Sequence, residues 1–310
     1  MPRPEIPRRA PLNDIPSQYT TSAPGLVLFM LDQSRSMVER DPATSETKAE
    51  TATRMLLRCV DEILAQSLRS SAPVDRMFIM IIGYCGTKDV QAEPPDPGVQ
   101  LLEAGWPGDL IRRHPKNPAT GLRTPPIIAV AEPVLPGTTP MDLAFDLATQ
   151  MIAKFFSDPD LHKGRFANSA PPLVINVTDG EPDDLPKKGY ANQRLPRPER
   201  NTRESVMRLK SLKTGCYAQH RPLVFNAHIT LETAQPIMFP TQAWANAQTD
   251  PWVRFLAEIS DYVPRPWVDA ARKSGTRLDD GALGLLINSR PEAIFEIITI
   301  GTLSSRTLEG

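Results

Sequence analysis

The chain has 310 residues, 40% of them hydrophobic, and a formal net charge of −1. This length can bury a substantial core as one large domain or two smaller ones, and the near-zero charge gives no general attraction to nucleic acid or membranes. No apolar run approaches ~18 residues, and the first residues lack the apolar segment of a secretion signal. Three cysteines are too few, and odd in number, for a disulfide framework, so we predict a cytoplasmic globular protein.

The 33 prolines, about twice the usual share, concentrate in three segments of the chain. Such segments are typical of extended linkers and loops. We therefore expect residues 1–23 to form a flexible leader rich in Pro and Arg, and residues 24–300 to form a single domain. Inserts are expected near residues 86–136 and 181–201, with a short tail at residues 301–310.

The first predicted strand ends in a cluster of oxygen-bearing side chains. Residues 26–31 form an unbroken apolar run, typical of a strand that is buried on both faces of a parallel sheet. Asp32, Ser34 and Ser36 follow it at alternate positions, so their side chains can lean toward one side. Taken alone, this cluster is equally typical of a turn or a helix N-cap.

The chain then continues with a predicted helix and two further strands. The apolar spacing of residues 45–70 predicts an amphipathic helix, and Thr47 with Glu50 matches a capping box at its start. The apolar run at residues 77–82 predicts the second strand, at residues 76–83. An edge strand is expected next at one of two places, between which the sequence does not decide: residues 99–102 or 127–130.

A Thr-Pro turn precedes the second predicted helix. Apolar residues recur at helical spacing between residues 141 and 156. Pro140 suits the first helical position, which makes Thr139 a natural N-cap. The alternative gives the same Thr139 hydroxyl to a bound metal ion, and one hydroxyl cannot do both well.

A second apolar run, residues 173–177, is also followed by a carboxylate, that of Asp179. In an open α/β sheet, ligands bind beyond the carboxyl ends of the strands, where the winding direction reverses. Two strands that both end in Asp at that place can converge on a hard cation. Mg²⁺ fits because it prefers oxygen ligands in near-octahedral geometry at ~2.0–2.1 Å. Asp32 and Asp179 therefore predict a shared metal site.

The rest of the chain continues the alternation of strands and helices. Periodicity predicts helices at residues 201–213, 252–259 and 293–300, and strands at residues 222–230 and 283–288. Alternating strands and helices indicate a parallel sheet that is covered by helices on both faces.

Three motifs together resemble the metal-ion-dependent adhesion site of the von Willebrand factor A family: Asp32-x-Ser34-x-Ser36, the Gly-Thr-Thr-Pro turn at residues 137–140, and Val177-Thr178-Asp179-Gly180. The resemblance covers roughly residues 23–300 and implies the intracellular bacterial type. It implies an α/β fold with a doubly wound, Rossmann-like, mostly parallel sheet of six strands in the order 3-2-1-4-5-6. One edge strand would be antiparallel, and helices would cover both faces. The implied ligands of Mg²⁺, or of Mn²⁺ in its place, are Asp32, Ser34, Ser36, Thr139 and Asp179, with Thr138 as the one-residue alternative for the threonine.

In this family a Glu or Asp of a partner protein completes the metal's coordination, so the resemblance implies a non-enzymatic protein-binding module. Intracellular bacterial members often serve as adaptors for AAA+ ATPases, or accompany kinases and phosphatases in stress-response or phage-defence systems. Such a protein partner is expected here, and neither a membrane nor nucleic acid. Two features depart from the family pattern: Arg35 stands where glycine is common, and the middle of the chain carries more inserted sequence.

The main alternative is a Mg²⁺-dependent phosphoryl hydrolase with Asp32 as the nucleophile. Such enzymes need a second carboxylate two residues later as the acid–base group, and Ser34 stands at that position. The sequence also lacks the glycine-rich phosphate-binding loops and the Gly-x-Ser-x-Gly motif. The basic segment at residues 186–203 begins close to Asp179, and it suits either an acidic partner surface or a solvated loop.

Overall fold

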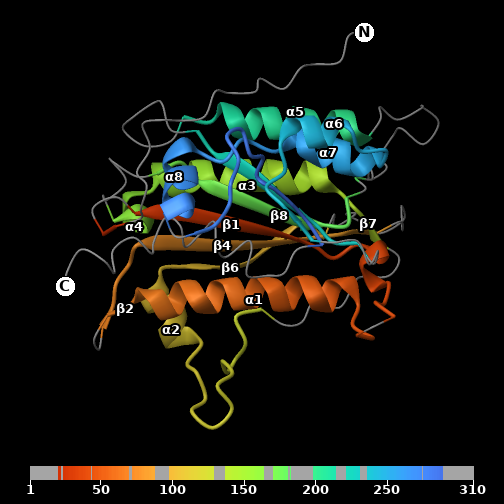
Figure 1. Ribbon diagram of the computed structural model, residues 1–310. Helices are drawn as coiled ribbons and strands as arrows, with labels where there is room; N and C mark the ends of the chain where they lie inside the picture. The colour runs from red at the N-terminus through yellow and green to blue at the C-terminus, as the bar shows by residue number, and fades with distance from the viewer. Residues whose placement is uncertain are drawn as a thin grey trace.

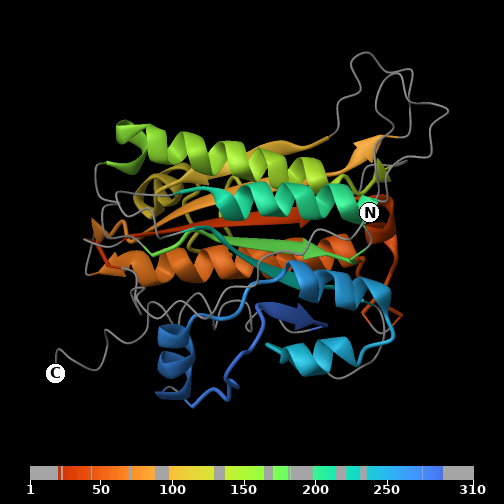
Figure 2. The same ribbon diagram turned by 90° about the horizontal axis from the view of Figure 1, so that it is seen from above.

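Five longer strands and two short ones form a seven-stranded sheet that carries helices on both faces (Figure 1; Figure 2). The computed structural model describes residues 20–21, 24–42, 44–69, 72–87, 98–128, 137–163, 170–180, 182, 198–213, 221–230, 236–273 and 275–288. Nearly all of the predicted leader, the predicted helix at residues 293–300 and the tail lie outside the described residues. Among the helices within them, none is long and apolar enough to cross a membrane.

The order of the strands confirms the predicted doubly wound α/β fold. Across the sheet the strands are β6 (Gln100–Gly105), β4 (Met77–Tyr84), β1 (Gly25–Asp32), β8 (Leu173–Thr178), β9 (Leu223–His228), β11 (Leu285–Ile287) and β10 (Ile237–Met238). The central pairs are parallel, since β1 pairs in parallel with both β4 and β8. The six predicted strands lie in the predicted order 3-2-1-4-5-6, but the sheet has a seventh strand that was not predicted, so the full order, numbered along the chain, is 3-2-1-4-5-7-6. This additional strand, β10, pairs antiparallel with β11.

The structure also decides between the two predicted positions of the edge strand. β6 overlaps residues 99–102 and runs antiparallel to β4, so the first position is confirmed. Ile127 and Ile128 at the second position are buried but belong to no strand. Two small ribbons were not predicted: β2 (Leu68–Arg69) with β3 (Ala72–Pro73), and β5 (Gly86–Thr87) with β7 (Gly137–Thr138).

Alternation along the buried strands explains why helices cover both faces of the sheet. In β1, Val27, Phe29 and Leu31 belong to one core cluster, and the residues between them belong to the other. The first cluster is closed by α1 (Lys48–Ser67), α2 (Pro107–Arg113) and α8 (Arg265–Lys273). The second is closed by α3 (Met141–Ser157), α5 (Pro198–Ser211), α6 (Gln242–Asn246) and α7 (Pro251–Ile259), with α4 (Pro159–His162) following α3 (Figure 1).

The predicted capping box fixes the start of α1. The Thr47 hydroxyl accepts a hydrogen bond from the Glu50 backbone N–H at 3.0 Å, and the Thr47 N–H donates to the Glu50 carboxylate at 2.7 Å. Both bonds satisfy N–H groups that have no partner inside the helix. The helix therefore begins at Lys48, three residues later than the apolar pattern alone predicts.

The Thr47→Ala substitution is expected to lower the free energy of unfolding by about 1 kcal/mol, because it leaves a first-turn N–H group without its side-chain acceptor. Urea denaturation monitored by circular dichroism measures this change. Thr120→Ala, in an exposed loop, is the control and is expected to stay within about 0.5 kcal/mol of wild type. Equal stability of the two variants would contradict the capping role of Thr47.

Candidate metal centre

The predicted metal ligands leave the sheet at the carboxyl ends of two adjacent strands. β1 and β8 are parallel neighbours, with Leu31 level with Val177. Asp32 and Asp179 therefore emerge at the same edge, at the right-hand end of the sheet in Figure 1, where α1 also begins. This edge lies between the strand that leads into α1 and the strand that follows α3, and these two helices cover opposite faces. It is the position at which an open α/β sheet binds its ligands.

Asp32 is a fully buried carboxylate that two neighbours hold in place. One of its oxygens accepts from the Ser34 backbone N–H at 2.9 Å, and the other accepts from the Thr178 hydroxyl at 2.7 Å. The Thr178 hydroxyl in turn accepts from the Gly180 N–H at 3.0 Å. Burial, and after it the Asp179 carboxylate, raise the pKa of Asp32 to about 7. A charge at Asp32 is therefore costly unless a cation neutralises it.

The loop after β1 brings two hydroxyls to the same edge. The hydroxyl oxygens of Ser34 and Ser36 lie 3.0 Å apart. A single turn of 3₁₀-helix, η1 (Arg35–Val38), follows, and its Met37 side chain is fully buried in the core beneath α1. This anchor leaves Arg35 and Ser36 exposed and Ser34 buried. The predicted proximity of Asp32, Ser34 and Ser36 is therefore present in the structure.

Asp179 supplies a second buried carboxylate with an unused oxygen. Its side chain is only 6% exposed, and one oxygen lies 3.4 Å from the Lys48 ammonium. The other oxygen is buried and makes no hydrogen bond with any residue that the structure describes. Buried polar atoms are rarely left in this state, and coordination to an ion is one way to satisfy such an oxygen. This oxygen is the feature of the edge that most directly fits a metal ligand.

The backbone around Asp179 is positioned by His228 at the end of β9. The His228 Nε2 lies 2.6 Å from the Asp179 carbonyl oxygen, so the imidazole must donate this bond. Burial lowers the pKa of His228 and keeps the ring neutral. Gly180 has a φ of +104°, and a Cβ there would lie 2.8 Å from the same Nε2. Glycine is therefore required after Asp179 for two reasons, its left-handed backbone and this close approach.

The prediction that Thr139 caps the second helix is wrong. α3 begins at Met141, and Pro140 occupies the N-cap position instead of the first helical one; its carbonyl accepts from the Ala144 N–H. Thr139 is buried, and none of the described contacts joins its hydroxyl to the other four predicted ligands. Because capping does not use this hydroxyl, it remains a candidate metal ligand. Thr138 instead pairs with Gly86 in the β5–β7 ribbon.

The groups at this edge suit a hard cation. Hydrogen-bond contacts connect Asp32 with the Ser34 backbone and Ser34 with Ser36. Asp179 lies close enough for its carboxylate to raise the pKa of Asp32. No cluster of three or more His, Cys, Asp or Glu residues that could hold a metal occurs among the described residues, so a zinc-like site is not indicated there. Carboxylate and hydroxyl oxygens are the donors that Mg²⁺ and Mn²⁺ accept. Metal binding by these residues remains a prediction.

Three residues of this edge were missed from the sequence: Thr178, Lys48 and His228. Thr178 precedes the acidic residue of its motif, and its sequence position alone does not show that its hydroxyl donates to Asp32. Lys48 could have been noticed in the sequence, because a lysine at the first position of a helix lies unfavourably at the positive end of the helix dipole. His228 carried no such signal, because a histidine at a strand end is usually a packing residue.

Only two of the basic residues in the predicted basic segment fall within the part of the chain that the structure describes. Lys187, Lys188, Arg194 and Arg197 lie outside the described residues, while Arg200 and Arg203 belong to α5. Arg203 forms a bidentate ion pair with Glu258 at 2.8 Å for both bonds, and Arg200 pairs with Glu204. The Arg203 pair therefore joins α5 to α7, whereas Arg200 pairs at the exposed surface within α5.

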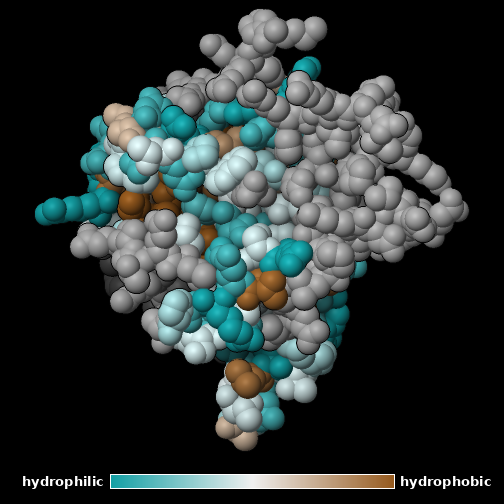
Figure 3. All heavy atoms as spheres, turned by 90° about the vertical axis from the view of Figure 1, so that its right-hand side faces the viewer, coloured by the Kyte–Doolittle hydropathy of each residue, from teal (hydrophilic) through white to brown (hydrophobic). Residues whose placement is uncertain are grey.

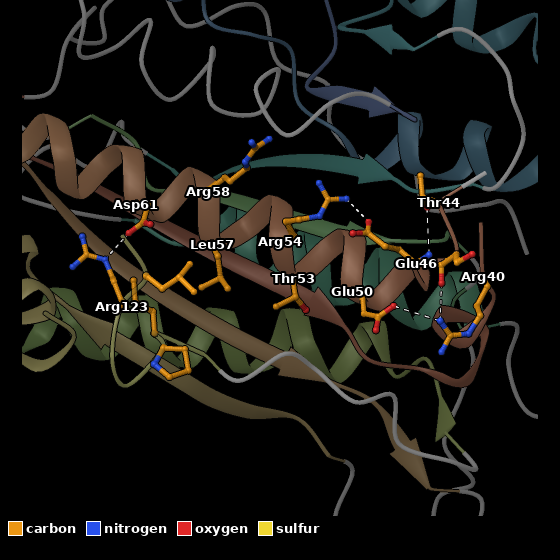
Figure 4. Close-up of a pocket in the computed structure, with 14 residues that line it drawn as sticks. Arg40, Thr44, Glu46, Glu50, Thr53, Arg54, Leu57, Arg58, Asp61 and Arg123 are labelled. Carbon is orange, nitrogen blue, oxygen red and sulfur yellow. Dashed lines mark hydrogen bonds and ion pairs between the residues drawn. The ribbon is translucent and has the colours of Figure 1, made fainter. Parts of the chain in front are cut away.

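A separate hollow of about 840 Å³ lies between α1 and the segment at residues 122–127 (Figure 4). Leu57, Pro126 and Ile127 contribute apolar lining, and Leu122 beside them is 70% exposed. The volume is within the range of small-molecule sites. Ion pairs occupy both ends, Arg54 with Glu46 and Arg123 with Asp61 (Figure 4). Since these four charged groups pair with one another, they do not indicate a particular ligand chemistry for the hollow.

Figure 3 faces the end of the molecule at which the candidate metal centre lies. The described residues form a mostly hydrophilic surface there, with small hydrophobic patches between them.

The sequence matches the model of no protein family and no curated protein. Similar solved structures include the pilus adhesin SpaC of Lactobacillus rhamnosus GG, with 12% identity over 91% of this chain and 30% of that one, at a TM-score of 0.48. Proximal thread matrix protein 1 of the mussel byssus has 10% identity over 94% and 48%, at a TM-score of 0.37. The manganese-loaded TRAP protein of Plasmodium vivax has 14% identity over 66% and 57%, at a TM-score of 0.29. This chain thus spans 30 to 57% of the length of these three proteins, and its function has to be argued from its own residues.

Proposed function

We propose that this chain is a non-enzymatic protein-binding module, which uses Mg²⁺ at the candidate metal centre to capture an Asp or Glu side chain of a partner protein. The observation that carries the proposal is the buried Asp179 oxygen without a hydrogen-bond partner among the described residues, next to the buried carboxylate of Asp32. Two carboxylates at one edge repel each other. A divalent cation between them would remove this repulsion and would also give the unpaired Asp179 oxygen a partner. The resemblance to the von Willebrand factor A family, drawn from three sequence motifs, supports the same assignment.

The metal would be held by Asp32, Ser34, Ser36, Thr139 and Asp179. Only two of these five groups carry charge, so bound Mg²⁺ would supply a poorly neutralised positive charge at the surface. Ser36 and the neighbouring Arg35 are exposed, so a side chain from outside can reach this edge. An anionic group gains more from such a site than a neutral one, and the carboxylate of a partner protein is the natural occupant.

The arrangement of Asp32 favours binding over hydrolysis. Both of its oxygens already accept hydrogen bonds, and the side chain is fully buried, so it is poorly placed to attack a phosphoryl group. Ser34 occupies the position at which a hydrolase needs a second carboxylate. His228, which lies beside Asp179, is engaged with the Asp179 carbonyl oxygen.

We therefore expect no release of phosphate from p-nitrophenyl phosphate or from ATP by the purified protein in Mg²⁺. A malachite green assay measures this release, with the Asp32→Asn variant as a matched control for contaminating phosphatases. Metal-dependent hydrolysis that the Asp32→Asn substitution abolishes would overturn the binding function and support the hydrolase alternative.

The proposed partners follow from the family resemblance alone. Intracellular bacterial relatives with these motifs act as adaptors for AAA+ ATPases, or accompany kinases and phosphatases in stress-response and phage-defence systems. We propose a partner of this kind for the present chain, with an acidic side chain exposed at the contact.

Metal-dependent capture of a partner tests the proposed function. Proteins that bind the immobilised chain in Mg²⁺ and elute in EDTA are identified, and their dissociation constants are measured by isothermal titration calorimetry. Asp32→Ala is expected to abolish binding, and Ser34→Ala and Thr139→Ala to weaken it by about tenfold or more, because each removes a metal ligand and little core volume. Thr149→Ala in α3 removes a hydroxyl that bonds only within its helix and is expected to bind normally. Binding that is indifferent to EDTA and to the substitutions at Ser34 and Thr139, in folded protein, would contradict the proposal.

A further inference from the structure

Lys48 is a buried lysine at the first position of α1, beside the candidate metal centre. Its ammonium lies 2.6 Å from a carboxylate oxygen of Glu39 and 3.4 Å from one of Asp179. Its backbone N–H also donates to the Glu39 carbonyl oxygen at 3.0 Å. The lysine is thus tied to the loop that follows η1 and, across 131 residues, to the end of β8.

Local structure gives no reason for a lysine at this place. The amino-terminal end of a helix carries partial positive charge, so a cation in the first turn is unfavourable. Burial of an ammonium group adds a desolvation cost unless it is paired. The two carboxylates compensate both costs, and one of them is a predicted metal ligand. Lys48 is therefore placed by the charge of the metal centre and not by the needs of the helix.

The two ion pairs of Lys48 are unequal. The pair with Glu39 is short, and the Glu39 side chain is 61% exposed, whereas the pair with Asp179 is longer and buried. The ammonium can consequently give up Asp179 and still keep a counterion. Among the described residues, no other cation lies within ion-pair distance of Asp32 or Asp179.

We infer that Lys48 is a tethered cation that neutralises Asp179 when the centre holds no metal, and that an incoming divalent ion displaces it onto Glu39 alone. The inference rests on the proposed metal centre. Lys48 would then act as a positioning residue that weakens metal binding in the resting protein. The metal would bind more tightly when further negative charge, such as a partner's carboxylate, is added to the site.

Binding of Mn²⁺ to the full chain, measured by calorimetry and by the electron paramagnetic resonance of free Mn²⁺, tests the role of Lys48. Lys48→Met is expected to raise the affinity about tenfold, because it removes the competing cation. Glu39→Gln is expected to lower the affinity severalfold, because the ammonium then has Asp179 as its remaining counterion. In the double variant the effect of Glu39→Gln is expected to disappear. Arg35→Gln, which removes an exposed cation from the same loop, is the matched control and is expected to change the affinity less than about threefold.

The outcomes separate this inference from the function on which it rests. Mn²⁺ binding to wild type that Lys48→Met does not strengthen would overturn the role of Lys48 and leave the metal centre intact. Absence of binding in both proteins would overturn both. Binding in Lys48→Met alone would support both, with the lysine as a strong competitor. Glu39→Gln provides an independent measurement if Lys48→Met does not fold, because Glu39 is largely exposed. An unchanged Mn²⁺ affinity in Glu39→Gln would also overturn the displacement of Lys48 from Asp179 onto Glu39.

Discussion

At about pH 8, Mg²⁺ is expected to raise the melting temperature of the wild-type protein, and the increase is expected to vanish in the Asp32→Asn variant. A ligand that binds only the folded state adds about 2.7 kcal/mol at a concentration 100 times its dissociation constant. For a chain of this size that corresponds to an increase on the order of 5 °C. Differential scanning fluorimetry with Mg²⁺ and with EDTA measures the difference.

The increase in melting temperature that Mg²⁺ causes is also expected to depend on pH, in a direction that the environment of Asp32 determines. Burial and the nearby Asp179 raise the pKa of Asp32 from its ordinary 3.8 to about 7 in the folded protein. The proton on Asp32 therefore stabilises the metal-free protein fully at low pH, and this contribution is lost as the pH rises from about 4 through about 7. A metal ion competes with that proton, so we expect a small effect of Mg²⁺ near pH 6 and a large one near pH 8.

Two comparisons check this account of Asp32. In EDTA at about pH 8, Asp32→Asn is expected to melt above wild type, because an amide carries no buried charge. Asp75→Asn, at the opposite end of the sheet and paired with Lys163, is expected to keep the full response to Mg²⁺. A response of equal size in wild type and Asp32→Asn would exclude Asp32 as a ligand.

The Asn176→Leu substitution in the centre of β8 is expected to lower the free energy of unfolding by roughly 3 kcal/mol. Asn176 is fully buried, accepts from the Tyr84 hydroxyl at 2.8 Å, and donates to the Asn226 side chain at 3.0 Å. Burial, and then the Asp32 carboxylate, raise the pKa of Tyr84 well above its ordinary value, so its hydroxyl stays protonated. Leucine would leave both neighbours with unsatisfied polar atoms, and each such atom costs about 1–3 kcal/mol.

A double-mutant cycle separates this cost from a change in packing. Tyr84→Phe removes the hydroxyl that Asn176→Leu would leave without an acceptor, so the double variant is expected to lose less stability than the sum of the single ones. Urea denaturation midpoints with unchanged slopes give the three free energies. A stability of Asn176→Leu within about 0.5 kcal/mol of wild type would show that the polar network is not important.

The long buried elements could be predicted because the residue patterns that produce them lie within short stretches of the sequence. The apolar runs of β1, β4 and β8 and the capping box of α1 are visible in short windows, and all four are present. β10 and the two ribbons have strands of only two residues, too short for any periodicity. Their pairing depends on distant backbone, as in the antiparallel contact of β10 with β11.

The acidic and hydroxyl groups of the candidate metal centre could be predicted from the sequence. The contacts that Thr178, Lys48 and His228 make with them could not. Asp32 and Asp179 follow apolar strands, and a sheet rule brings such ends together. The helix start was misplaced by one residue, because Pro140 suits the N-cap as well as the first helical position. The contact of Lys48 with Asp179 spans 131 residues, and no pattern in the sequence connects them.

The hydrogen bond between Thr178 and Asp32 joins residues that lie 146 positions apart. A contact that closes so long a loop forms only when β1 and β8 have paired, which places it late in folding. The unfolded chain and its early intermediates would therefore offer a metal ion no assembled set of ligands. A metal bound at this edge would slow unfolding and leave the refolding rate nearly unchanged, so it would lengthen the lifetime of the native protein without helping it to fold.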